Sequence, residues 1–173
     1  MEQKDAKTLK HLVSMYRADR STRNFIEVFD ALCDSYVWVP CKAVLSDADN
    51  EAVEKLLDEL NGDYGQLEGK TLTTQDQIRL IPDILYNGDD FYFPIFSSAE
   101  EMGEYGNNFS KIEKHILEVI PLARNNEKYV KGLVLNAFSE PFILPLEFFD
   151  TVESWNSGGN CNEDEDTRKR AIK

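Results

Sequence analysis

The spacing of apolar residues along the chain predicts helices, mostly in its first third, and strands, mostly further on. Apolar side chains recur at helical spacing in three segments, which are residues 4–18, a segment that begins at Ser21 or Thr22, and residues 47–60. A polar, turn-rich loop is expected over residues 65–77. Strands are predicted at residues 36–40, with a continuation to 45 left open, and at 78–86, 91–96, 132–136 and 142–144.

Local signals refine the strand assignments. Pro82 cannot donate a hydrogen bond to a neighbouring strand, so the strand over 78–86 is expected at a sheet edge or with a bulge. Asn87-Gly88 predicts a tight hairpin turn into the strand that follows. Together these elements predict an α+β fold, with a mixed or antiparallel sheet of about five strands and helices packed around it.

The segment between the predicted strands at residues 91–96 and 132–136 is open to two interpretations. Residues 109–113 fit a strand or the first turn of a helix, and Pro121 favours an element boundary near residues 117–120. Upstream, Ser97 and Ser98 each precede a glutamate by three residues, which predicts overlapping capping boxes for a short helix.

Composition restricts the classes of partner. The 173 residues include 19 Lys and Arg against 32 Asp and Glu, a net charge of -13. Such a surface repels phosphate backbones and anionic headgroups, so we expect no nucleic-acid or membrane partner and favour a basic protein. No leader and no long apolar run is evident, and Cys33 and Cys41 are interpreted as buried packing residues, which together predict a cytoplasmic protein.

Two sequence runs resemble one known family. The runs FYFPIFSSAEEM at residues 91–102 and KGLVLNAFSEPFILP at 131–145 are similar to the N-terminal domain of the SseB (enhanced serine sensitivity) family, and residues 25–40 fit its opening. Ala137 stands where the family usually has proline. The resemblance implies a bacterial, cytosolic α+β domain with no settled enzymatic role, and so no catalytic residue or cofactor to carry over.

The resemblance also suggests a division of the chain. Residues 1–20 are interpreted as an N-terminal helix extension, 21–153 as the SseB-like domain with an insertion at about 46–77, and 154–173 as a mobile polar tail. The monomer and the dimer both remain open, since an exposed strand edge at 78–86 would permit pairing between copies.

One acidic motif suggests catalysis but is better explained as a helix cap. Asp47 and Asp49 after a strand are spaced as in Mg²⁺-dependent phosphatases, but Asn50 and Glu51 do not fit that motif. Ser46, Asp47 and Asp49 instead suit the start of a helix. We therefore predict no catalytic residues, no metal site and no cofactor, with the phosphatase kept as an alternative.

The remaining candidate site is a binding surface formed by strand ends. Alternation along the strands cannot bury every aromatic side chain, so some are expected to remain exposed at a sheet edge. The predicted surface consists of Tyr92, Phe96, Asn136, Phe138 and Ser139. We expect a non-catalytic interaction or regulatory module, in one form an immunity-type inhibitor of a basic partner. The alternative is a metabolite sensor with a pocket beside Pro40 and Pro94.

Overall fold

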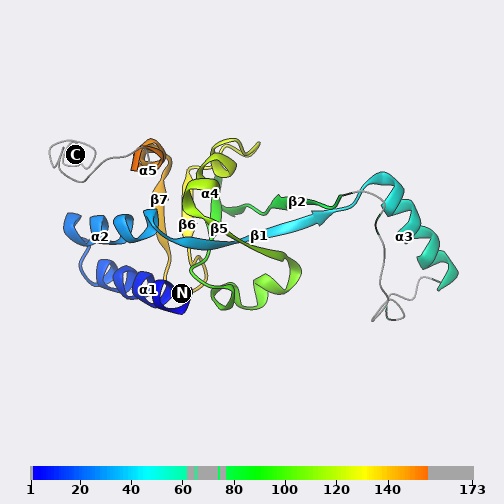
Figure 1. Ribbon diagram of the computed structural model, residues 1–173, viewed down its shortest axis with the longest axis horizontal. Helices are drawn as coiled ribbons and strands as arrows, with labels where there is room; N and C mark the ends of the chain where they lie inside the picture. Colours follow the sequence, from blue (N-terminus) through cyan, green and yellow to red (C-terminus); the bar gives the residue numbers. More distant parts are fainter. Residues whose placement is uncertain (1, 62–64, 66–73, 75–76, 156–173) are drawn as a thin grey trace.

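The computed structural model describes residues 2–61, 65, 74 and 77–155. Two antiparallel helices, α1 (Glu2–Ala18) and α2 (Thr22–Cys33), lie at one end of the molecule (Figure 1). The Ser21 side chain accepts a hydrogen bond from the backbone N–H of Asn24 and begins α2 as the sequence predicts. Apolar residues of both helices, Leu9 and Val13 among them, are buried in the core.

Within the described residues seven strands form two sheets, and the predicted α+β class is confirmed. The three-stranded sheet has the order β2 (Arg79–Pro82), β1 (Tyr36–Val44), β5 (Ser110–His115), with antiparallel neighbours. The four-stranded sheet has the order β3 (Leu85–Asn87), β4 (Asp90–Ile95), β6 (Gly132–Leu135), β7 (Phe142–Pro145). Only β4 and β6 run parallel in this sheet.

An isolated β-bridge between Trp38 and Phe96 connects the two sheets. The backbone N–H of Trp38 donates to the carbonyl of Phe96 at 2.8 Å, and the N–H of Phe96 donates back to Trp38 at 2.9 Å. The single strand predicted over residues 78–86 is divided at Asp83 and Ile84, after Pro82. Its first part pairs with β1, and the N–H of Asp83 still donates to the carbonyl of Pro40 at 2.9 Å, whereas its second part pairs with β4 in the other sheet.

The segment with two interpretations contains both a strand and a helix. Strand β5 passes directly into α4 (Ile116–Arg124), whose first turn is capped by the His115 ring nitrogen. The predicted boundary before Pro121 is wrong, because α4 continues through this proline. Pro121 costs one backbone hydrogen bond, and the buried face of Ile116, Val119 and Ile120 holds the helix on the core.

The predicted capping boxes at Ser97 and Ser98 are wrong. A kinked 3₁₀ segment, η2 (Ala99–Asn108), follows Ser98, whose side chain makes no cap hydrogen bond, and Gly103 takes a φ of 53° at the kink. The described part of the chain ends in a short 3₁₀ turn, η3 (Leu146–Phe148), followed by the helix α5 (Phe149–Trp155). Of the predicted polar tail, residues 156–173 lie outside the described residues, as does most of the predicted loop at 65–77.

The core lies between the helices and the sheets. Its members come from α1, α2, β1, β4, α4, β6, β7 and α5, and the largest completely buried side chains include Phe93, Phe142, Phe149, Ile116 and Leu133. Residues 1–20 were interpreted as an extension, and α1 nevertheless supplies Leu9 and Val13 to this core. The first helix is therefore packed as part of the domain.

Helix α3 (Asp47–Glu59) stands apart from this body. It follows the end of β1 and projects from the far end of the β1–β2 pair (Figure 1). The Ser46 hydroxyl accepts from the backbone N–H of Asp49 and donates to its carboxylate at 2.9 Å. The acidic motif thus caps a helix, as the simpler interpretation of the sequence predicts.

Candidate functional site

The parallel pair of β4 and β6 positions one buried asparagine at its carboxyl end. The backbone N–H of Asn136 donates to the carbonyl of Ile95 at 2.9 Å. Its side-chain oxygen accepts from the N–H of Ser97 at 2.9 Å, and its side-chain nitrogen donates to the Ser97 hydroxyl at 3.0 Å. These bonds satisfy a polar side chain that is only 1% exposed, so Asn136 acts as a structural clamp between the strands.

Asn136 also starts the turn that presents the neighbouring residues. Its φ of 50° is in the left-handed region, which asparagine adopts more readily than most residues. Its carbonyl accepts from the backbone N–H of Ser139 at 3.2 Å, which closes the turn. Phe138 lies within this closed turn and remains 54% exposed.

The ring of Phe138 is supported by a cluster of aromatic side chains. It stacks on Phe96 at 5.9 Å between centroids and contacts Tyr105 at 4.8 Å. Tyr105 in turn contacts Phe109 at 4.6 Å. We call Phe138, Ser139, Glu101, Tyr105 and Phe109, together with the completely buried Phe96 that supports them, the Phe138 surface. Offset aromatic pairs at such distances stabilise one arrangement of the rings, so Phe138 is held in position before any partner binds.

The far side of the cluster is fixed by an aspartate. The Tyr105 hydroxyl donates to Asp83 at 2.7 Å, and the Lys42 ammonium lies 2.6 Å from the other oxygen of the same carboxylate. Lys42 also lies over the Phe109 ring at 5.7 Å. Burial, and then the bond to Asp83, raise the pKa of Tyr105 far above its usual value, so this phenol stays protonated and keeps donating.

A carboxylate connects the near side of the surface to α1. Glu101 accepts a hydrogen bond from Ser139 and lies 2.7 Å from the Lys10 ammonium. Burial alone would raise the pKa of Glu101, but the bonds from Lys10 and Ser139 outweigh it and lower this pKa. Glu101 is therefore charged at neutral pH and fixes Ser139 to the helix pair.

The structure brings four of the five predicted surface residues together. Phe96, Asn136, Phe138 and Ser139 meet at the carboxyl ends of β4 and β6, but Phe96 and Asn136 are buried there and support the exposed Phe138 instead of contributing to the surface. Tyr92 does not join them, because it pairs with Leu85 at the hairpin end of β4, about 13 Å of extended chain before Phe96. Tyr105 and Phe109 were not predicted, since they lie around a kinked segment that has no regular periodicity.

The other candidate residues lie elsewhere. Asp47 and Asp49 are in the cap of α3, and within the part of the chain that the structure describes no three His, Cys, Asp or Glu side chains form a group that could hold a metal ion. Cys33 and Cys41 are buried thiols, as expected, and burial raises the pKa of Cys41 to about 11. None of the described helices is both long and apolar enough to cross a membrane.

Comparison with known proteins gives one match. No curated protein and no solved structure is found to match the chain. The family described as SseB protein N-terminal domain matches residues 9–147, which include most of α1 and both sequence runs that carry the resemblance. The chain therefore belongs to the SseB N-terminal domain family.

Proposed function

We propose that this chain is a non-catalytic protein-binding module and that the Phe138 surface is its binding site. The observation that carries the proposal is the large aromatic ring of Phe138, which is more than half exposed, lies within a closed turn and contacts two other rings. Aromatic side chains that are fixed before binding lose little entropy on complex formation, and they dominate the energetics of many interfaces.

The charge of the protein points to the kind of partner. The chain carries a net charge of -13, and Glu104 and Glu140 flank Tyr105 and Ser139 in the sequence. A partner with exposed lysines or arginines would be attracted to this side at long range, and one of its cations could lie over the Phe138 ring. A basic toxin masked by the module is one partner of this kind.

A pull-down with matched variants tests this function. The tagged protein is used to capture partners from the native host at low and at moderate salt, beside Phe138→Ala and Tyr86→Ala. Tyr86 is a suitable control because its ring is 77% exposed and it lies in β3, in the hairpin away from the Phe138 surface. We expect wild type and Tyr86→Ala to retain one basic protein that Phe138→Ala does not, and moderate salt to reduce its capture.

Two results would count against the proposal. Capture of no specific protein at either salt concentration would remove the binding function and shift attention to a small ligand. Equal capture by Phe138→Ala and wild type would leave a binding module but would show that its site lies elsewhere.

A further inference from the structure

The end of the β1–β2 pair is a ribbon with solvent on both faces. Strand β5 begins at Ser110, opposite Cys41, so beyond Cys41 β1 pairs with β2 alone. We call residues 42–44 and 78–81 the ribbon, and the ribbon together with residues 45–61 the arm. Each ribbon residue is exposed, although alternate residues point to opposite faces. An isolated two-stranded ribbon is only marginally stable in water.

The ribbon exposes apolar side chains where a free strand edge would need protection. Val44, Ile78, Leu80 and Ile81 are between 37% and 48% exposed. Natural edge strands are usually protected by charges or by a covering element. Arg79 is the one charged residue of β2, and it takes part in no ion pair with the described residues. The ribbon is therefore apolar with a cationic end, an unusual surface on a strongly acidic protein.

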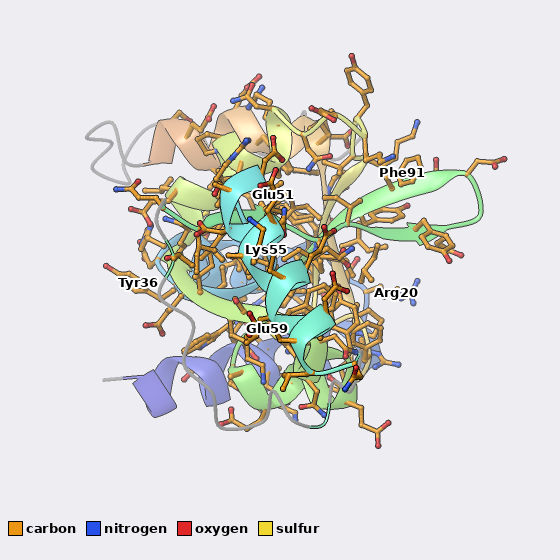
Figure 2. All side chains as sticks on the ribbon, turned by 90° about the vertical axis from the view of Figure 1, so that its right-hand side faces the viewer. Arg20, Tyr36, Glu51, Lys55, Glu59 and Phe91 are labelled. Atoms are coloured by element: carbon orange, nitrogen blue, oxygen red, sulfur yellow. The ribbon has the colours of Figure 1, made fainter. Side chains whose placement is uncertain are left out.

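Helix α3 carries the complementary surface. Its apolar stripe of Val53, Leu56, Leu57 and Leu60 remains partly exposed, and within the helix only Asp49 is buried. Its polar residues Glu51, Lys55 and Glu59 follow one another along the side that faces the viewer in Figure 2, away from the body. The helix contains six carboxylates and one lysine, a net charge of -5. The ribbon contains no carboxylate, and of its two cations Lys42 is paired with Asp83, which leaves Arg79 to face the carboxylates of a helix.

We propose that the arm is a dimerisation element, in which the ribbon of one copy packs against α3 of a second copy and the reverse contact forms at the same time. Each contact would join an apolar, cationic ribbon to an apolar, anionic helix. Because both halves are present on every chain, one two-fold axis would satisfy both contacts in a closed dimer.

A second copy suits the arm better than a foreign partner. A basic helix from another protein would complement α3 but would bring its cations towards Arg79 on the adjoining ribbon. An acidic segment would complement the ribbon but would be repelled by the carboxylates of α3. A partner that fits both parts must place an anionic surface against the ribbon and a cationic surface against α3. The arm of a second copy does this, since its α3 is anionic and its ribbon is cationic.

The mass of the protein in solution, measured by light scattering across a range of concentrations, tests the proposal. We expect twice the mass of one chain at concentrations of several hundred micromolar, and dissociation on dilution. Leu80→Asp and Arg79→Glu should each shift the midpoint of dissociation at least tenfold towards higher concentration. Ile143→Asp is the matched control, since its side chain is 47% exposed on β7 in the body.

Further measurements keep the outcomes distinct. Circular dichroism and thermal unfolding of each variant establish that its body is folded, and Arg79→Glu changes an exposed side chain outside the core. Phe138→Ala should remain dimeric, so failure of the proposed binding function would leave this inference untouched. A wild-type protein that is monomeric at every concentration would overturn the dimer. So would an Ile143→Asp variant that dissociates as readily as Leu80→Asp and Arg79→Glu. A monomer whose arm binds a cationic helical peptide would assign the arm to a foreign partner instead.

Discussion

Two residues at opposite ends of β6 are required for different physical reasons. Gly132, at the start of the strand, lies so close to β7 that an added Cβ would be 3.0 Å from the Cα of Pro145 and would collide with the carbonyl of Leu144. Asn136, just beyond the end of the strand, combines a positive φ with a buried hydrogen-bonding side chain. The position of Gly132 has no space for a side chain, whereas the position of Asn136 requires the asparagine side chain.

Substitution of Gly132 by alanine should destabilise the fold. The backbone of β7 must move to make room for the methyl group, so we expect a loss of about 1–3 kcal/mol in the free energy of unfolding. Urea denaturation measures this loss. Lys131→Ala, at the exposed neighbouring position, should stay within about 0.5 kcal/mol of wild type. Equal stability of Gly132→Ala and wild type would contradict the close packing of β6 on β7.

Two substitutions separate the backbone role of Asn136 from its side-chain role. Asn136→Gly and Asn136→Ala both lose the hydrogen bonds to Ser97, but only glycine accepts a φ of 50° without strain. We expect the alanine variant to be less stable than the glycine variant by about 1 kcal/mol. Thermal or urea unfolding of the two variants measures this difference. Equal stabilities would mean that the φ of residue 136 is not constrained.

At the scale of residues, the sequence predicted which side chains end the strands better than what supports them. Phe96, Asn136, Phe138 and Ser139 follow strands with clear patterns, and the structure brings them together. Tyr105 was not predicted because its position depends on the kink at Gly103 and on a bond to Asp83, far from it in sequence. A long-range contact of this kind leaves no periodic signal in a single sequence.

Among the elements, α1 shows how a helix at the chain terminus can be part of the core. Leu9 is 2% exposed and packs with the other core residues. Leu9→Ala should lower the free energy of unfolding by about 2–5 kcal/mol, the usual cost of a cavity in a core. The control, Ser14→Ala, changes an exposed residue of the same helix. A separate extension would instead leave the unfolding of the domain unchanged when Leu9 is truncated.

The contact between α1 and η2 should depend on pH in one direction. The folded state lowers the pKa of Glu101 below its ordinary value of 4.5, so the unfolded state binds more protons as the solution is acidified. Stability from the Lys10–Glu101 pair is therefore complete above about pH 4.5 and is lost as pH falls through the lower, folded pKa.

Unfolding measurements across pH test this contact. Glu101→Gln should cost up to about 1 kcal/mol at neutral pH, since Lys10 is half exposed, and the difference from wild type should shrink below pH 4.5. Glu118→Gln is the control, because it removes only the exposed ion pair that Glu118 forms with Lys114 where β5 passes into α4. A constant difference from pH 7 to pH 3 would mean that charge on Glu101 is not what stabilises the contact.

Element boundaries were predicted where the signal is local and missed where packing decides. Ser21 and Ser46 cap helices as expected. Pro121 does not end α4, because buried contacts of the helix outweigh the lost hydrogen bond. The division of residues 78–86 between two sheets depends on which strands lie nearby, and a propensity pattern does not contain that information.

At the scale of the whole molecule, the structure separates two surfaces. The body carries the Phe138 surface where the helices, η2 and both sheets meet, while the arm projects from the far end of β1 (Figure 1). Net charge and amphipathic patterns predicted an acidic protein with exposed aromatic residues. The shape of the arm was not predicted, since the sequence gives helix α3 the same amphipathic pattern as a helix packed on a core.

Binding of a basic protein through Phe138, as proposed, can be measured with the partner that the pull-down captures. The experiment is titration calorimetry of this partner with wild type, Phe138→Ala and Tyr86→Ala. A ring at the centre of an interface typically contributes about 2 kcal/mol or more, so Phe138→Ala should weaken binding by roughly 30-fold or more, with Tyr86→Ala close to wild type. Affinities of Phe138→Ala and wild type within twofold of each other would contradict the claim.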